Sequence, residues 1–156
     1  MANIGVIGMA VMGKNLALNL ESRGYEVAIY NRTHSVTEEV LRENEGLNLV
    51  GSESIEKFVG LLERPRKIII MVKAGNPVDM TIESLITYLD KGDIIIDGGN
   101  SFFRDSERRY RSLKEKGLNF VGLGVSGGET GARFGPALMP GCDKEVYQEI
   151  KPYLES

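Results

Sequence analysis

The stretch IGVIGMAVMG, residues 4–13, decides the fold of this chain. Its first four residues are apolar and β-rich, and they lead directly into a glycine-rich turn and a segment with helical spacing. The turn matches the pattern GxGxxG, with Ala10 in place of the middle glycine. Gly8 suits a tight turn, Ala10 is small enough for a pyrophosphate to approach the backbone, and Gly13 allows close packing of helix on sheet. Because amides at the start of a helix point at phosphates, the stretch predicts nucleotide binding.

Short apolar runs alternate with helically spaced segments along the rest of the chain. Strands are predicted at 4–7, 27–30, 49–50, 68–72, 94–96 and 120–121. Helices are predicted at 11–21, 36–44, 55–62, 78–89, 105–116 and 144–154. The runs IIIMV and IIID are continuous rather than alternating, as strands covered on both faces require. We therefore predict one α/β domain over residues 1–156, a Rossmann-type, doubly wound, mainly parallel sheet with helices on both faces.

One segment lacks any sustained period. Residues 122–141 are rich in glycine and contain two prolines, and we predict a long loop there. Long structureless loops are uncommon inside compact domains and are often functional, so this loop is a candidate site.

Composition excludes several classes of protein. The 156 residues fit one domain, and 42% hydrophobic with 26% charged residues is typical of globular domains. A net charge of −3 gives no electrostatic reason to expect binding to nucleic acid or to a membrane. With Cys142 as the single cysteine, we expect no intrachain disulfide and no metal site. No apolar run spans about 18 residues and the N-terminus lacks a basic signal region, so we expect a cytoplasmic protein.

The end of the second predicted strand distinguishes two cofactors. An acidic residue there accepts hydrogen bonds from the ribose 2′-hydroxyl of NAD, but this chain has Asn31, Arg32 and Thr33. An amide, a guanidinium and a hydroxyl can all donate to a 2′-phosphate, which favours NADP over NAD. The alternative is an ordinary solvated arginine at a strand end.

Other polar segments follow the remaining strands. Residues 72–75, 97–101 and 124–129 all end strands at the edge where ligands bind in doubly wound sheets. Asp97 is expected to accept hydrogen bonds from turn amides. The charges of the helix at 105–116 are interpreted as a solvated face, with contact to a phosphate or a partner as the alternative. Ser101 and Ser126 have no histidine partner in their motifs, and His34 lies at the predicted adenosine end, which argues against hydrolase chemistry.

Five motifs carry a resemblance to a known family. They are GMAVMGKNLALN, YNRT, MVKAG, IIDGGNSFFRDSERR and GVSGGETGARFGPALMPG. Together they resemble the N-terminal NADP-binding domain of the 6-phosphogluconate dehydrogenases, over essentially the whole chain. The related β-hydroxyacid dehydrogenases share the early glycine turn, but the GPALMPG and IIDGGNS runs argue against them. A non-catalytic nucleotide-binding or sensing module also remains open.

The resemblance implies specific contacts. For NADP it implies Gly8, Met9, Ala10, Val11, Met12, Gly13, Asn31, Arg32, Thr33, Val72, Lys73, Ala74 and Asn100. For the substrate, 6-phosphogluconate, it implies Asn100, Ser126, Gly127 and Gly128.

The resemblance also implies a reaction. A hydroxyl of the substrate loses a hydride to NADP, and the resulting keto acid loses carbon dioxide to leave ribulose 5-phosphate. The lysine and glutamate that move protons, and most dimer contacts, are expected beyond Ser156, in a following helical domain that nothing in this chain matches. We therefore expect no catalytic residue within residues 1–156. The whole protein is then a homodimer, and we expect this chain to be able to exist as a monomer and to bind the cofactor without turnover.

Overall fold

A computed structural model describes residues 1–126, 128–135 and 137–156. The described residues form seven strands: β1 (Ile4–Ile7), β2 (Val27–Tyr30), β3 (Leu49–Gly51), β4 (Lys67–Ile70), β5 (Ile94–Asp97), β6 (Asn119–Ser126) and β7 (Ala137–Gly141). They also form seven helices: α1 (Val11–Ser22), α2 (His34–Glu43), α3 (Ile55–Gly60), α4 (Asn76–Ile86), α5 (Phe103–Glu115), α6 (Gly128–Phe134) and α7 (Lys144–Leu154).

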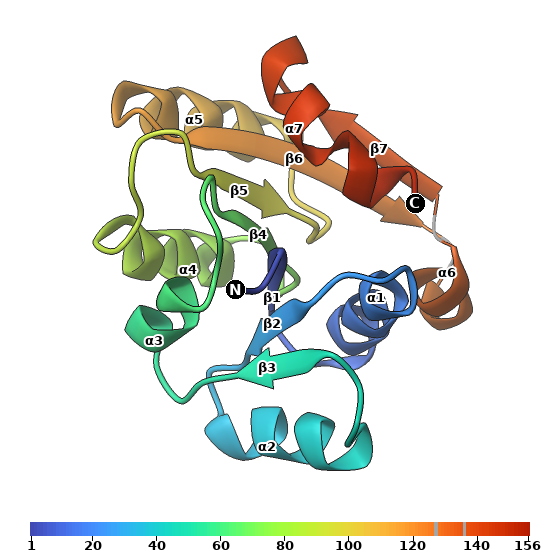
Figure 1. Ribbon diagram of the computed structural model, residues 1–156. Helices are drawn as coiled ribbons and strands as arrows, with labels where there is room; N and C mark the ends of the chain where they lie inside the picture. The colour runs from blue at the N-terminus through green and yellow to red at the C-terminus, as the bar shows by residue number, and fades with distance from the viewer. Residues whose placement is uncertain (127, 136) are drawn as a thin grey trace.

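The strands form one sheet in the order β3-β2-β1-β4-β5-β6-β7 (Figure 1). Strands β1 to β6 pair in parallel, and β7 pairs with β6 in the antiparallel direction. From β1 the chain continues to β2 and β3 on one side, and it then crosses to β4 on the other side of β1. This reversal creates a topological switch point at the carboxyl edge of the sheet, between β1 and β4. The predicted Rossmann-type, mainly parallel sheet is confirmed.

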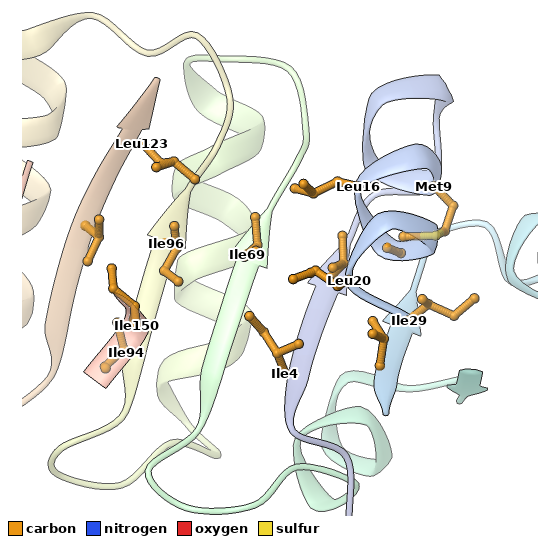
Figure 2. Close-up of a cluster of buried hydrophobic side chains, with 14 of the residues drawn as sticks. Ile4, Met9, Leu16, Leu20, Ile29, Ile69, Ile94, Ile96, Leu123 and Ile150 are labelled. Atoms are coloured by element: carbon orange, nitrogen blue, oxygen red, sulfur yellow. The ribbon is translucent and has the colours of Figure 1, made fainter. Parts of the chain in front are cut away.

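Each face of the sheet has its own apolar core. Helices α1, α2 and α7 cover one face, and Figure 2 shows Leu16 and Leu20 of α1 and Ile150 of α7 beside side chains of the strands. Helices α3, α4 and α5 cover the other face. In β4, Ile69 belongs to the first core and Ile68 and Ile70 to the second. The continuous apolar runs therefore arise from burial on both faces, as predicted.

The prediction of a long loop at 122–141 is wrong. Strand β6 continues to Ser126, and α6 and β7 follow it. Gly122 pairs with Gly141 and Leu123 with Pro140, so this ladder includes glycine and proline, which have low strand propensity. In the described sheet β7 is an edge strand, where proline is tolerated because one side of the backbone has no neighbour. Among the described helices, none is long and apolar enough to cross a membrane.

Phe58 of α3 tests the packing on the second face. Its side chain is fully buried, and its ring lies so close to β1 that a Cβ on Gly5 would be 2.6 Å from it. We expect Phe58→Ala to lower the free energy of unfolding by about 3–5 kcal/mol, because the ring is lost and a cavity remains. Phe134→Ala, at a phenylalanine that is 67% exposed, serves as the control and is expected to change it by about 0.5 kcal/mol or less. Urea unfolding followed by circular dichroism measures both, and equal losses would contradict the assignment of Phe58 to the core.

Candidate functional site

Two glycines bring the start of α1 against the ends of β1 and β4. Gly8 has a φ of 99°, and a Cβ on it would be 2.3 Å from the carbonyl oxygen of Met71. A Cβ on Gly13 would be 1.8 Å from the carbonyl oxygen of Gly8. Neither position has room for a side chain, so the tight turn and the close packing predicted from the sequence both require glycine.

The first turn of α1 leaves its amides open. The N-cap residue, Ala10, makes no side-chain hydrogen bond to them, and the first turn contains no acidic residue. Ala10 and Val11 are exposed. The first amides of a helix have no partner within the helix and carry partial positive charge. This end of α1, at the switch point of the sheet, therefore has the donors that a pyrophosphate needs.

Asn31 fastens the glycine turn to the end of β2. Its side-chain oxygen accepts a hydrogen bond of 2.9 Å from the amide of Met9, and its amide nitrogen donates to the carbonyl of Thr33 at 3.1 Å. The sequence pattern predicted Asn31 only as a cofactor contact. Its positioning role was missed because the amide it holds lies 22 residues away, and no local pattern shows that contact.

A cleft of about 420 Å³ opens beside this turn. Its lining includes Gly8, Asn31, Arg32, Val72 and Met80. Arg32 is exposed, and its guanidinium makes no ion pair or hydrogen bond within the part of the chain that the structure describes. The cleft therefore has a cation at its rim that can bind an anion.

Thr33 lies at the N-cap of α2, beside this cleft. It is exposed, and its side chain makes no hydrogen bond to the first turn of the helix. Its hydroxyl is therefore available to a ligand.

The loops after β4 and β5 lie against each other. A Cβ on Gly99 would be 2.7 Å from the carbonyl oxygen of Val72, so the two backbones nearly touch. Lys73 and Asn100 are exposed on these loops, and Ala74 is half-buried. Asn100 lines a neighbouring hollow of about 690 Å³. The structure therefore places Gly8, Asn31, Arg32 and Val72 on one cleft, and Asn100 on a separate hollow that residues of α5 and β6 also line.

The predicted substrate segment lies farther along. Asp97 at the end of β5 pairs with Gly122 of β6, so Ser126 is four residues, or about 13 Å, beyond that level. Gly128 begins α6, and Gly127 lies outside the described residues. Helix α6 packs beside α1 (Figure 1), so this segment passes to the α1 face of the sheet.

The last described residue, Ser156, follows α7 and is not part of this edge of the sheet. It is exposed, and its hydroxyl donates to the carbonyl of Tyr153 at 3.1 Å. The family resemblance assigned it no role and only placed the proton-transferring lysine and glutamate after it. That placement beyond Ser156 stays a prediction.

One charged residue of α5 is buried, which corrects the interpretation of this helix as a solvated face. Arg109 is only 2% exposed. Its Nε donates to Asp79 at 2.8 Å, its Nη1 to Ser101 at 3.1 Å and Asp97 at 3.4 Å, and its Nη2 to the carbonyl of Gly75 at 3.2 Å. Because Asp79 belongs to α4, 30 residues earlier, the local charge pattern could not show this network. The other cations of the helix and its end are exposed, as predicted: Arg104, Arg108, Arg111, Lys114 and Lys116.

The pKa values of the two carboxyl groups in this network shift in opposite directions. The hydrogen bond from Arg109 holds the pKa of Asp79 below its ordinary value. Burial raises the pKa of Asp97, against hydrogen bonds from Ser101 and from the amide of Gly99. The bond from the Gly99 amide, 3.0 Å long, confirms the predicted role of Asp97 in its turn.

The sequence matches the family model described as the NAD binding domain of 6-phosphogluconate dehydrogenase over residues 3–156. The chain belongs to this family. It is 59% identical over 98% of its length to the NADP(+)-dependent, decarboxylating 6-phosphogluconate dehydrogenase of Bacillus subtilis. It is 60% identical over 99% of its length to the decarboxylating enzyme of Lactococcus lactis subsp. lactis. The chain covers 33% of each of these proteins, so it spans about a third of the length of these curated relatives.

Solved structures agree with this assignment. The chain is similar, with a TM-score of 0.92 and 46% identity, to Plasmodium falciparum 6-phosphogluconate dehydrogenase, covering 98% of this chain and 33% of that one. A Mycobacterium tuberculosis 3-hydroxyisobutyrate dehydrogenase has a TM-score of 0.84 at 21% identity, covering 99% of this chain and 51% of that one, and shows a shared fold. The resemblance drawn from the five sequence motifs is therefore confirmed at the level of the family.

Asp79 provides a test of the buried network through pH. A carboxyl whose pKa is lowered by folding stabilises the protein above its ordinary pKa of 3.8, and this contribution is lost as the pH falls through the folded pKa. Because Asp79 is 35% exposed and partly screened, we expect Asp79→Asn to cost about 1 kcal/mol of unfolding free energy at pH 7, and less at pH 3. Urea unfolding at both pH values measures the difference. Glu107→Gln, at an exposed residue of α5, is the control, and a cost for Asp79→Asn that grows toward pH 3 would contradict the network.

Proposed function

We propose that this chain binds NADP(H) at the carboxyl edge of its sheet, as the coenzyme-binding part of a 6-phosphogluconate dehydrogenase. The observation that carries this proposal is the open first turn of α1 at the switch point, next to a cleft with the exposed cation Arg32 at its rim. The relatives support the choice of cofactor. The Bacillus subtilis protein is named NADP(+)-dependent, and the Plasmodium falciparum enzyme has been described in complex with NADP+ and with 6-phosphogluconate.

The coenzyme would lie across the switch point with one half on each side. Residues 8–13 would surround the pyrophosphate, and the open amides at the start of α1 would donate to it, because the amides of Gly8 and Met9 already donate within the protein. Arg32 and Thr33 would donate to the 2′-phosphate on the side of β2, and Asn31 would keep this turn next to α1. Residues 72–74 and Asn100, after β4 and β5, would contact the nicotinamide half.

The substrate of the whole protein would be 6-phosphogluconate. When bound, the nicotinamide of NADP accepts a hydride from a hydroxyl-bearing carbon of the substrate. We propose Asn100 and residues 126–128 as substrate contacts of this chain. The groups that move protons, the homodimer of the whole protein and a cytoplasmic location remain predictions from the family resemblance and the sequence.

A non-catalytic nucleotide-binding module is the second candidate. It is favoured by one observation, that the donors proposed for the coenzyme all lie within these 156 residues. Coenzyme binding and the lack of turnover by this chain are expected of both candidates. A reading frame that continues past Ser156 would favour the enzyme part, and a stop codon there would favour the module.

Coenzyme selectivity tests the role of Arg32. We expect NADPH to bind more tightly than NADH, and we expect Arg32→Glu to weaken NADPH binding by about tenfold or more, because a carboxylate then faces the 2′-phosphate. Calorimetric titration of each coenzyme measures both affinities. Arg42→Glu makes the same change of charge at the exposed far end of α2 and is expected to leave NADPH binding unchanged. Tighter binding of NADH by the unmodified protein would overturn the role given to Arg32.

An assay of NADPH formation tests whether this chain catalyses the reaction by itself. We expect the 156-residue chain to bind NADPH but to form none from NADP+ and 6-phosphogluconate, because the proton-transferring lysine and glutamate are predicted to lie beyond Ser156. Absorbance at the NADPH band measures formation, and NADPH titration of the same sample is the control for a folded site. Steady NADPH formation by this chain would refute the prediction.

A further inference from the structure

The Arg109 side chain joins three segments that are distant in sequence. Helix α5 carries it into the interior, where it meets the loop after β4 at the carbonyl of Gly75. It meets the turn after β5 at Asp97 and Ser101, and it meets α4 at Asp79. A single guanidinium therefore links the loop after β4, the turn after β5 and helix α4.

The geometry of these contacts requires an arginine. Nε and Nη2 both donate to Asp79, Nη2 also donates to the carbonyl of Gly75, and Nη1 donates to Ser101. The planar fork fixes the directions of these bonds. Burial of a cation is costly unless it is paired and hydrogen-bonded, and Asp79 and Asp97 supply the pairing. A lysine would keep the charge, but its ammonium is a compact point charge that cannot span the same partners.

The two loops that Arg109 joins contain the residues proposed for the nicotinamide half of the coenzyme. Residues 72–74 immediately precede Gly75, and Asn100 immediately precedes Ser101. At 2% exposure, Arg109 itself is shielded from a bound ligand. The turns proposed for the pyrophosphate and the 2′-phosphate are held by other contacts, chiefly the hydrogen bond between Asn31 and the amide of Met9.

We infer that Arg109 is a positioning residue that aligns the loops after β4 and β5 for the nicotinamide half of the coenzyme, and that the adenosine half binds independently of it. This inference rests on the proposed function. It predicts that loss of the guanidinium weakens binding of the nicotinamide half and leaves binding of the adenosine half unchanged. A general loss of stability would instead weaken binding of both halves.

The neighbouring residue offers a matched control. Arg108 lies on the same helix and also pairs with Asp79, at 3.1 Å. Its side chain is 56% exposed, and among the described residues its guanidinium pairs with Asp79 and Asp105 and with no residue of either loop. The same substitution at the two positions therefore separates the loop contacts from the loss of an arginine paired with Asp79.

The experiment titrates NADPH and adenosine 2′,5′-bisphosphate, which carries only the adenosine half, into the unmodified protein and its variants. For Arg109→Lys we expect a dissociation constant for NADPH about tenfold higher or more, and one for the bisphosphate within about twofold of the unmodified value. For Arg108→Lys we expect both constants within about twofold. Circular dichroism confirms that each variant is folded at the temperature of titration.

A second variant keeps the test decisive if Arg109→Lys does not fold. Ser101→Ala removes one hydroxyl, which donates to Asp97 and accepts from Arg109. We expect the two ligands to differ in the same way: the dissociation constant for NADPH rises about threefold, and that for the bisphosphate is unchanged.

The possible outcomes lead to different conclusions. Unchanged NADPH affinity in the folded Arg109→Lys variant, or in Ser101→Ala where Arg109→Lys is unfolded, would overturn the positioning role, and so would parallel loss of both ligands. If the unmodified protein bound no NADPH, the proposed function itself would fail. If the unmodified protein binds NADPH but the variants change the affinities for NADPH and the bisphosphate equally, only the inference about Arg109 would be overturned.

Discussion

The contact between Gly13 and the carbonyl of Gly8 is the constraint on which the carboxyl edge of the sheet depends. With a Cβ position only 1.8 Å from that oxygen, the helix can begin this close to the strand only if the residue has no side chain. The same turn lies against Met71 at the end of β4, because Gly8 also lacks a side chain. The open amides of α1 are thereby placed at the point where the strand order reverses, which is where a doubly wound sheet has room for a ligand.

Two different sets of hydrogen bonds then hold the loops at this edge in place. On the side of β2, the Asn31 side chain binds the glycine turn through a neutral hydrogen bond. On the side of β4 and β5, a buried cation performs the corresponding task through charged hydrogen bonds to two carboxylates and a backbone carbonyl. Charge-assisted hydrogen bonds are stronger and more directional than neutral ones. The second side is built from longer loops, because five residues separate β4 from α4 and β5 from α5, against three between β1 and α1 and between β2 and α2. The hydrogen bonds of Arg109 stabilise these longer loops.

Much of the fold follows from the sequence, because local periodicity determines it. Each short apolar run between 4 and 97 predicted a strand within two residues of its observed bounds, and the glycine turn was placed correctly. The sequence failed where pairing is made by the backbone between distant residues, as between Gly122 and Gly141. It failed again at Arg109, whose partners lie on other elements while its neighbours on α5 are solvated. The predicted site residues Gly8, Arg32, Val72 and Asn100 do gather at one edge, since parallel strands bring their carboxyl ends together.

The net charge of the chain is a poor guide to its site. A formal charge of −3 argues against anionic partners in general, yet the edge of the sheet has local features that favour an anion. The first turns of α1 and α2 contain no acidic side chain, so the partial positive charge at both helix ends is not neutralised there. Arg32 adds a full charge at the rim of the cleft that Gly8 also lines, whereas the side chain of Asn31 is already hydrogen-bonded to the backbone. Because ions screen exposed charges beyond roughly 8–10 Å, the distant carboxylates that make the chain acidic have little effect on a phosphate bound at this edge.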